Sequence, residues 1–450
     1  MSSPLVPRAK KLAGWGRYPV QTCHVYCPRS ESEIMQLLKS GLPFIARGNG
    51  RAYGDSALNR EATLQMGHFN RLLGFNPQTG QLIAEAGVLL ADILDIFVPR
   101  GWFPLITPGT KFVTVGGMIA ADVHGKNHHK EGSFLNSVDW LDLLTAEGQV
   151  YRCSPSENRD LFYWTVGGMG LTGVILRAAF RLRPIETAWI RQTTHIAKNL
   201  EATLDLFETF EGVTYSVAWI DCLAGGAQLG RSVVMLGEHA TREELPAKYR
   251  QRPLQTPQRH KISIPVDFPN SALNSLTVRA FNQLYFHRQQ RKAGRSFVDW
   301  DTFFYPLDSL LGWNRIYGRR GFVQFQCVLP LGAAREGLAA LLHCTSAAGA
   351  GSFLAVLKKL GHSQGYFSFP MAGYTLALDF PMSQRTLKVL DQLEEITLQY
   401  GGRFYLAKDS HLTPRRLRQS DSRVETFVQV RNAQQWTVHF ASEQSKRLKL

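Results

Sequence analysis

The sequence predicts an α+β fold made of two units that differ in character. Its 450 residues exceed one ordinary domain, and 44% of them are hydrophobic, which is enough for sizeable cores. Up to Pro184 the chain is rich in glycine and in short apolar runs. From about 187 to 400, strand-like stretches alternate with helical ones, and this pattern predicts an antiparallel sheet backed by helices.

The elements of the first unit follow from the spacing of apolar residues. Residues 42–59 begin like a strand and run into a glycine loop. Residues 81–101 are typical of a strand followed by a helix, because apolar positions then recur near i, i+3, i+4 and i+7. Residues 139–154 alternate around a Glu-Gly turn, which predicts a hairpin.

The second unit contains strand-like and helical stretches in turn. Strands are expected within 215–223, 231–239, 321–330, 352–361 and 374–380, and helices within 333–349 and 383–402. A last strand signal, GGRFYLAKDS at 401–410, opens a C-terminal piece that is too short to stand alone. We therefore expect this piece to return to the first unit.

Charge and composition restrict the classes of partner. The formal net charge of +15 favours nucleic acid, an anionic membrane face or a phosphorylated small molecule. Basic residues concentrate at 241–261 and 287–295, which we interpret as exposed loops and not as a nucleic-acid groove, because aromatic residues are not interleaved there. The six cysteines form no CxxC pair, which argues against a disulfide framework or a zinc ribbon.

The sequence also predicts where the protein resides. No apolar run approaches the roughly 20 residues that span a bilayer, and the first residues lack the apolar segment of a secretory signal. We expect a cytoplasmic protein.

Two familiar motifs lack the context that their chemistry needs. GMGLTG at 168–173 matches the dinucleotide fingerprint, but the stretch after it alternates like a strand, so we expect a plain glycine turn. GHSQG at 361–365 matches the nucleophile elbow of hydrolases, yet no helix is expected after Ser363. Because Asp409 and His411 follow in the order of a catalytic triad, a serine hydrolase remains a minor alternative.

The stretch HGKNHHK at 124–130 raises the question of a metal site. His124 and His128 would share one face of a helix, as zinc ligands do, but Gly125 and Asn127 disfavour a helix and no third ligand is close in the sequence. We therefore expect no metal, and we interpret His129 and Lys130 as parts of a polar loop.

Two glycine-rich loops indicate where a phosphate-bearing ligand could bind. RGNGRAYGD at 47–55 and the stretch from Pro108 to Gly117 lie some sixty residues apart, and neither carries the lysine of a P-loop. Glycine lets a ligand approach the backbone closely and frees N–H groups as donors. The pair of loops fits a pyrophosphate cradle.

Longer stretches resemble a known family. ARGNGRAYGD, TPGTKFVTVGGMIAADVHGKNHH, DWLDLLTAEGQ and VGGMGLTGVILRA look like the FAD-binding half of the vanillyl-alcohol-oxidase-type flavoproteins. FFYPLDSLLGWNRIYGRRGFVQFQ, SFLAVLKKLG, FPMAGYTLALDFP and GGRFYLAKDS resemble the decaprenylphosphoryl-β-D-ribose 2-oxidase family. The resemblance implies a two-subdomain FAD-binding domain of the PCMH/VAO type at 1–186, a substrate domain at 187–402 and a C-terminal return at 403–450.

The same resemblance implies an activity and its partners. Members oxidise the 2-hydroxyl of a polyprenyl-phosphoryl ribose, and a separate NAD(P)H-dependent short-chain reductase completes epimerisation to the arabinose form. The alternative within the superfamily is another sugar-alcohol or aldonolactone oxidase. We expect a lipid-linked phosphoryl sugar as substrate, no nucleic-acid partner, and a peripheral membrane contact near the basic segments.

Residues are assigned to FAD by matching position. The first loop is expected to wrap the pyrophosphate, and the second to hold the adenosine-diphosphate portion and approach the isoalloxazine. The assigned residues are Arg47, Gly48, Asn49, Gly50, Arg51, Tyr53, Gly54, Pro108, Gly109, Thr114, Gly116, Gly117, His124, Gly125 and Tyr405. Many relatives bind the flavin covalently through a histidine at the position of Arg51, so the resemblance implies non-covalent FAD.

The resemblance also implies the catalytic residues. Lys408, His124 and Lys126 are expected to face flavin and substrate, because alcohol oxidation needs a proton acceptor and an anionic phosphate needs cations. Burial lowers the pKa of a lysine toward the range of proton transfer. Tyr405 and Lys408 reach the same site only if their strand bends before Asp409. Mycobacterial members carry a cysteine where this chain has Ala377, so reagents that trap that cysteine are not expected to label it.

Overall fold

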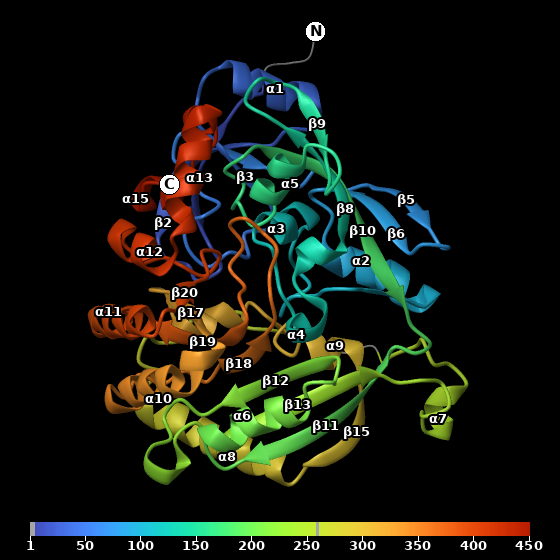
Figure 1. Cartoon of the computed structure of the whole chain (residues 1–450), viewed down its shortest axis with the longest axis vertical. Coiled ribbons are helices and arrows are strands. Elements are labelled where there is room, and N and C mark those ends of the chain that lie inside the picture. Colours follow the sequence, from blue (N-terminus) through green and yellow to red (C-terminus); the bar gives the residue numbers. More distant parts are fainter. Residues whose placement is uncertain (1–4, 258–260) are drawn as a thin grey trace.

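The N-terminal part forms two sheets in a computed structural model that describes residues 5–257 and 261–450 (Figure 1). The first has the order β1 (Arg8–Ala13), β2 (Val20–Tyr26), β4 (Thr63–Gln65), β3 (Ile45–Arg47). The second has the order β5 (Leu72–Asn76), β6 (Gln81–Glu85), β10 (Val174–Pro184), β8 (Val138–Leu144), β9 (Val150–Cys153), with β7 (Trp102–Pro104) also paired to β10. The antiparallel pair β8 and β9 confirms the predicted hairpin.

Short helices fill the space around these sheets. They are α1 (Glu31–Lys39), α2 (Leu90–Phe97), α3 (Val115–Ala120), α4 (His128–Glu131) and α5 (Arg159–Thr165), with the 3-10 turns η1 (Val98–Arg100) and η2 (Phe134–Ser137). Helix α2 buries Leu90, Ile93, Leu94 and Phe97, which is the predicted spacing of an amphipathic helix against the second sheet. Strand β10 directly follows the glycine turn at 168–173, as expected.

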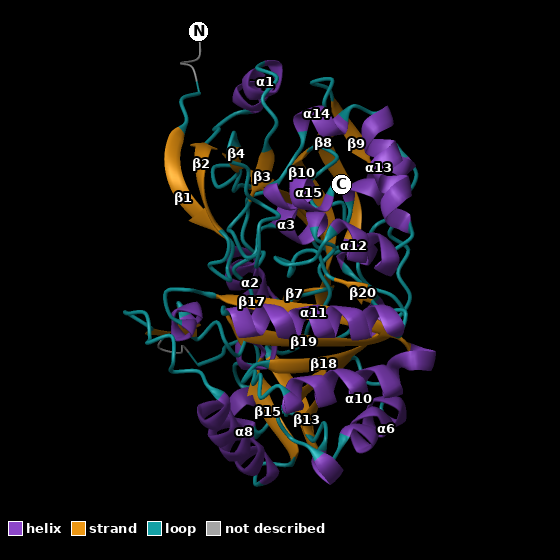
Figure 2. Ribbon diagram, turned by 90° about the vertical axis from the view of Figure 1, so that its left-hand side faces the viewer, coloured by secondary structure: helices purple, strands orange, loops and turns teal. Residues whose placement is uncertain are grey.

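An eight-stranded antiparallel sheet dominates the remainder. Its order is β15 (Gly294–Asp299), β11 (Trp189–Ala197), β13 (Ser232–His239), β12 (Tyr215–Ile220), β18 (Ala355–Leu360), β19 (Gly373–Pro381), β17 (Phe322–Pro330), β20 (Arg403–Phe404). One face packs against α6 (Leu200–Thr209), α10 (Leu331–Ala347) and α11 (Gln384–Gln399), which Figure 2 shows along the outside of the molecule. The other face is turned toward the N-terminal part. The predicted antiparallel sheet backed by helices is confirmed.

The chain ends in α12 (Pro414–Ser420), α13 (Arg423–Ala433), α14 (Trp436–His439) and α15 (Glu443–Leu448), which lie on the left-hand side of Figure 1. The link between α14 and α15 contacts the N-terminal part. Phe440 pairs with Phe44 through a backbone bridge, and their rings meet edge to face at 5.4 Å. The buried Asn59 side chain donates to the Ala441 carbonyl at 2.7 Å. These contacts bring the end of the chain back to its first ninety residues.

The interpretation of the basic segment 287–295 as a loop needs correction. Residues 287–290 end helix α8 (Ser275–Gln290), and residues 294–295 begin β15. The 241–261 segment contains the short α7 (Ala247–Arg250), and its residues 258–260 lie outside the described part. Helix α8 forms because Val278, Asn282 and Phe286 are buried along one side, so tertiary packing overrides the polar composition.

Smaller elements complete the fold. They are η3 (Gly226–Gln228), α9 (Trp300–Phe304), η4 (Trp313–Tyr317) and the parallel pair β14 (Ile262–Ser263) and β16 (Leu310–Leu311). Within the described ranges, no helix combines the length and hydrophobicity that crossing a bilayer requires.

Candidate active site

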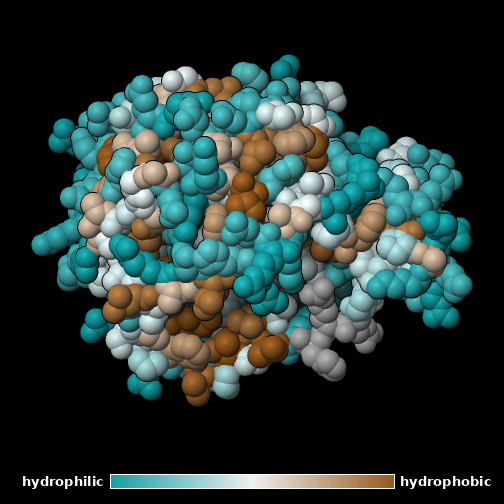
Figure 3. Space-filling view, turned by 90° about the horizontal axis from the view of Figure 1, so that it is seen from below, coloured by the Kyte–Doolittle hydropathy of each residue, from teal (hydrophilic) through white to brown (hydrophobic). Residues whose placement is uncertain are grey.

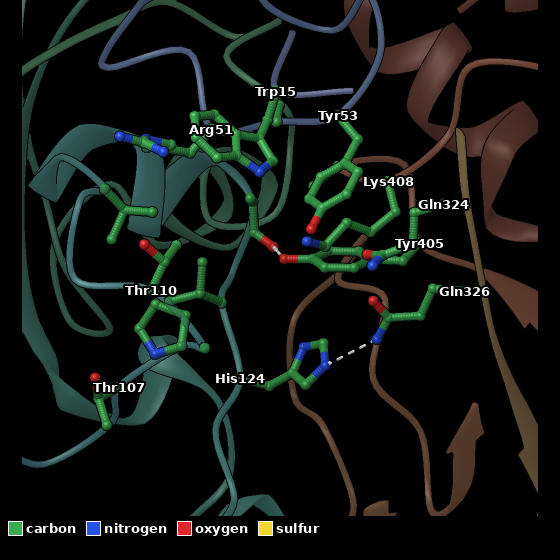
Figure 4. Close-up of a pocket in the computed structure, with 18 of the residues that line it drawn as sticks. Trp15, Arg51, Tyr53, Thr107, Thr110, His124, Gln324, Gln326, Tyr405 and Lys408 are labelled. Carbon is green, nitrogen blue, oxygen red and sulfur yellow. Dashed lines mark hydrogen bonds between the residues drawn. The ribbon is translucent and has the colours of Figure 1, made fainter. Parts of the chain in front are cut away.

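A cavity of about 420 Å³ separates the glycine-rich loops from the free face of the large sheet (Figure 4). Its size is in the range of sites for small molecules and cofactors. Most residues assigned from the sequence line it: Gly48, Asn49, Gly50, Arg51, Tyr53, Pro108, Gly109, Thr114, Gly116, Gly117, His124, Gly125, Lys126, Tyr405 and Lys408. The fold thus brings together loops that are up to 360 positions apart.

The two glycine-rich loops hold each other in place. Asn49 in the first loop donates through Nδ2 to the carbonyl of Phe112 in the second, at 2.8 Å. A Cβ atom on Gly48 would lie 2.2 Å from Thr114 Oγ1, so only glycine allows this approach. The loops therefore form one unit against which a ligand can lie.

The cradle fits a bound dinucleotide. None of the backbone N–H groups from Gly48 to Ala52 donates to another described residue, so they remain available to an anion. A Cβ atom on Gly109 would meet nothing within 4 Å, which means that this position opens onto free space. Free donors beside open space are what the pyrophosphate of FAD requires.

Two assigned residues do not reach the cavity wall. The guanidinium of Arg47 donates to the carbonyl of Ala13 at 2.8 Å and to that of Ala57 at 3.3 Å. A Cβ atom on Gly54 would lie 2.1 Å from the Asp409 carbonyl. Both residues therefore support the first loop from behind.

Arg51 is held by aromatic rings at the rim. Its guanidinium carbon lies 4.0 Å from the ring centre of Trp15 and 5.1 Å from that of Phe112. Trp15 was not assigned from the sequence, because an isolated tryptophan near the start of a chain carries no pattern. The stacking leaves Arg51 as a fixed cation beside the cradle.

The large sheet supplies a wall that sequence reasoning missed. Gln326 pairs with Ala377, which in turn pairs with Val356, so these side chains share one face. Two residues away on their strands, Gln324 and Lys358 face the same way and also line the cavity. The signal was present in FVQFQCVLP, because two glutamines at i and i+2 are unusual on a buried strand.

His124 contributes a neutral imidazole to this wall. Its Nε2 lies 3.2 Å from Gln326 Nε2, and the same amide donates to Thr375 Oγ1 at 3.1 Å (Figure 4). Burial and, to a smaller extent, the nearby Lys358 lower the pKa of His124 well below its usual value. A neutral ring that accepts at Nε2 carries its proton on Nδ1, and that nitrogen has no partner among the described residues.

Lys408 and Tyr405 both reach the cavity because the strand ends early. Strand β20 stops at Phe404, and the Lys408 N–H donates to the Tyr405 carbonyl at 2.9 Å, which closes a turn. The ammonium of Lys408 lies 3.8 Å from the ring centre of Tyr53. The hydroxyl of Tyr405 donates to the Ala121 carbonyl at 2.9 Å (Figure 4). The bend that the assignment required is thus present.

A buried carboxyl group influences Lys408. Burial lowers the pKa of Lys408, the charge of Asp379 opposes this shift, and Lys358 adds to it. Asp379 is fully buried; its Oδ1 accepts from Gln324, and its Oδ2 has no partner among the described residues. Burial raises the pKa of Asp379. The protonation of the two groups is therefore linked.

The other two lysines of the cavity differ in their contacts. Burial lowers the pKa of Lys126 to about 7 and that of Lys358 to about 8. The Lys126 ammonium donates to the Phe303 carbonyl and lies 4.2 Å from the centre of that ring. Lys358 makes no hydrogen bond or ion pair with a described residue, so it remains available to an anionic ligand.

The remaining histidines of HGKNHHK support neighbouring loops. His128 Nδ1 accepts from the Gly361 N–H at 3.0 Å, and His129 Nε2 lies 2.9 Å from the Val213 carbonyl. Within the described residues, the group with metal-ligand spacing consists of Asp391, Glu394 and His411, and it includes neither histidine. Arg416 donates to both carboxylates of that group, which identifies it as an ion-pair cluster.

The hydrolase motif does not form a triad. The hydroxyl of Ser363 accepts from the Gly365 N–H at 3.4 Å, and no helix follows it. His411 Nδ1 pairs with Glu394 at 2.9 Å, while Asp409 Oδ2 pairs with Arg447 at 2.8 Å. Asp409 accepts from the backbone N–H of His411 at 2.9 Å and not from its ring, and Ser363 contacts neither residue in the described chain. The fold therefore gives no support to serine hydrolysis.

Comparisons with known proteins identify the class of cofactor. The FAD binding domain family matches residues 23–154. Decaprenylphosphoryl-beta-D-ribose oxidase from Mycolicibacterium smegmatis is 35% identical over 98% of this chain and 98% of its own length. L-gulonolactone oxidase from Mus musculus is 29% identical over 41% of this chain and 44% of its own length. A cytokinin dehydrogenase from Arabidopsis thaliana is 29% identical over 40% and 35%, respectively.

The arginine in the first loop generates a prediction. A guanidinium cannot form the covalent bond that a histidine forms with flavin, so FAD bound beside Arg51 should be released when the yellow protein is precipitated with acid. The measurement is the visible spectrum of the supernatant and of the washed pellet. A flavin spectrum that stays with the pellet would contradict the prediction.

Proposed function

Because the chain belongs to the decaprenylphosphoryl-beta-D-ribose oxidase family of FAD-dependent oxidoreductases, we propose that it oxidises the 2-hydroxyl of a polyprenyl-phosphoryl ribose to the 2-keto sugar. The observation that carries the proposal is the similarity along 98% of both chains. We further propose that a separate NAD(P)H-dependent short-chain reductase reduces the keto sugar to the arabinose form.

The cavity lies between two parts of the chain, and we assign cofactor binding to one part and sugar binding to the other. The segments 1–186 and 403–450 bind FAD, and the segment 187–402 binds the sugar. The residues of the two glycine-rich loops hold the pyrophosphate and the adenosine-diphosphate portion, and Tyr405 contacts the cofactor. Free N–H groups from Gly48 to Ala52 support this assignment.

Lys408 is the proposed proton acceptor. FAD supplies the two-electron acceptor that takes hydride from the carbinol carbon. The proton of the hydroxyl goes to Nζ of Lys408, which burial keeps partly deprotonated near neutral pH. His124 is neutral, and its buried Nδ1 has no partner among the described residues, which supports a role as hydrogen-bond donor to a sugar oxygen. Lys126 is the third member of this group, and its bond to Phe303 favours a role in shaping the site.

Lys358 is the proposed anchor of the phosphoryl group. Its half-buried side chain lines the cavity and has no partner in the described chain. A desolvated ammonium of this kind is costly unless a ligand supplies the negative charge. The neighbouring Lys359 points to the opposite face of the sheet and pairs with Glu208 at 2.7 Å and Glu211 at 2.9 Å. The two adjacent lysines therefore form a matched pair for experiment.

The competing activity is that of an aldonolactone or sugar-alcohol oxidase. L-gulonolactone oxidase matches only 41% of this chain. This shorter match supports the alternative activity less well than the match along 98% of the chain supports the proposed one. An oxidase of a neutral sugar has no use for an unpaired, desolvated ammonium at the substrate wall. Dependence of activity on the substrate phosphate separates the two candidates.

Replacement of the proposed base tests the reaction. We expect Lys408→Ala to retain FAD and to reduce the rate of flavin reduction by phosphoribosyl lipid by about 10²- to 10⁴-fold. Stopped-flow absorbance under anaerobic conditions measures this rate. Lys446→Ala, at an exposed ion pair with Glu61, is the control. A Lys408→Ala rate within about threefold of the parent rate would remove Lys408 from this role.

The pH dependence tests the link between Asp379 and Lys408. Flavin reduction should accelerate as pH rises through the lowered pKa of Lys408, because the neutral amine accepts the proton. Since the Asp379 charge raises that pKa, Asp379→Asn should move the rising limb to lower pH, while its Oδ1 still accepts from Gln324. Asp142→Asn, a buried acid on β8, should leave the limb in place. A limb that stays or moves upward in Asp379→Asn contradicts the link.

The phosphate anchor has its own test. Lys358→Met should lower kcat/KM for the phosphorylated substrate by about 10- to 100-fold, which corresponds to one charge-assisted hydrogen bond. The effect should appear mainly in KM and vanish with a ribosyl lipid that lacks phosphate. Lys359→Met should have little effect on either substrate. An equal loss of kcat/KM on both substrates would show that Lys358 does not bind the phosphate.

A further inference from the structure

Exposed apolar side chains concentrate on one face of the molecule. Among the exposed large hydrophobic residues of the described chain, seven lie between positions 262 and 311: Ile262, Val266, Phe268, Leu276, Phe281, Leu284 and Leu311. Leu276 and Leu284 are 76% and 73% exposed and are the two most exposed among the large hydrophobic residues described. Figure 3 shows hydrophobic side chains gathered at one edge of the lower surface. Contiguous patches of this kind mark interaction surfaces.

Helix α8 is held firmly while it presents this face. Its Asn274 cap accepts from the N–H groups of Leu276 and Thr277, and Phe286 packs with Trp219 and Val233 on the cavity side of the sheet. On the outer side, Leu276, Ala280 and Leu284 are four residues apart and form one row. The apolar row is therefore a fixed feature of the folded protein.

The apolar face borders the cavity. Tyr285 of α8 and Trp313, which follows β16 closely, both line the cavity. Phe281 meets Phe353 at 5.7 Å, and Phe353 also stacks with Tyr317 at 5.7 Å, which connects α8 to the 310–317 segment. The segment from Ile262 to Phe268 is joined to the 310–317 segment by a hydrogen bond in which the Ile264 N–H donates to the Leu311 carbonyl at 2.9 Å.

The charge around this face is mainly positive. No Asp or Glu occurs between Asp267 and Asp299, whereas Arg279, Arg288, Arg291 and Lys292 in that stretch are all exposed. Arg295 is also exposed, but it pairs with Glu244 at 3.2 Å. Asp267 itself is paired with Arg17 at 2.5 Å. Exposed leucines rimmed by arginine and lysine suit the interface of an anionic bilayer, where the apolar tips enter the acyl boundary and the cations meet lipid phosphates.

We propose that α8 and the 262–268 segment form a docking face for an anionic lipid bilayer, so that the cavity opens beside the membrane. This rests on the proposed function for its purpose, since a polyprenyl-linked sugar is embedded in lipid. The docking itself depends only on the exposed apolar row and its basic rim. A nucleic-acid partner has no use for exposed leucines, because bases stack on aromatic rings.

Vesicle flotation of the FAD-loaded protein tests the proposal. The parent should float with vesicles of phosphatidylcholine containing 30% phosphatidylglycerol, but not with pure phosphatidylcholine, and high salt should weaken the binding. Leu276→Ser/Leu284→Ser should lower the fraction bound at least about tenfold in partition coefficient. Arg288→Glu/Arg291→Glu should do the same. The matched control, Leu331→Ser/Val438→Ser, alters exposed apolar residues elsewhere and should bind like the parent.

A second readout separates this proposal from the reaction. Flavin reduction by a water-soluble short-chain phosphoribosyl substrate should be equal in the parent and in Leu276→Ser/Leu284→Ser, since neither leucine lines the cavity. Absence of flotation, or equal flotation of both leucine pairs, would overturn the docking face whatever the activity. A dimer of the parent that Leu276→Ser/Leu284→Ser dissociates, without lipid binding, would assign the face to self-association and also overturn it.

Discussion

Three half-buried lysines that line one cavity are the constraint on which the site depends. Taking a lysine out of water favours its neutral form. Three lysines close together also repel one another when charged, which further raises the free energy of the charged forms. The chain compensates in a different way at each position. Lys126 bonds to a backbone carbonyl, Lys408 is offset by the charge of Asp379, and Lys358 is left without a partner. This inequality gives each lysine a distinct proposed role.

The cradle opposite depends on close backbone approach. Gly48 and Thr114 come so near that a Cβ atom cannot be inserted between them, and Asn49 ties the loops together from the side. Arg47 and Gly54 stabilise the first loop without reaching the ligand space. Some of the residues assigned by matching position therefore line the cavity, and others, such as Arg47 and Gly54, pack behind the loop and hold it in place.

The departures from the family pattern are local. Ala377 lies on the cavity wall between Gln326 and Val356. The resemblance implies a cysteine at this position in mycobacterial members. The small side chain leaves the surrounding ring of Gln326, Lys358 and His124 intact. Chemistry that depends on the lysines and the histidine is therefore compatible with the absence of the thiol.

Much of this protein was determined by the sequence alone. The spacing in 81–101 predicts β6 and α2, and the glycine loops predict the cradle, because such patterns depend on neighbours in the chain. Helix α8 escaped prediction, since apolar residues on both of its sides blur the period. Only the tertiary structure decided that Gln324, Lys358 and Lys408 line one cavity and that the charge of Asp379 acts on Lys408. It also decided that the strand ends at Phe404, so that Tyr405 and Lys408 reach the same cavity. These contacts join strands far apart in the chain, and pairing register across a sheet fixes which side chains share a face.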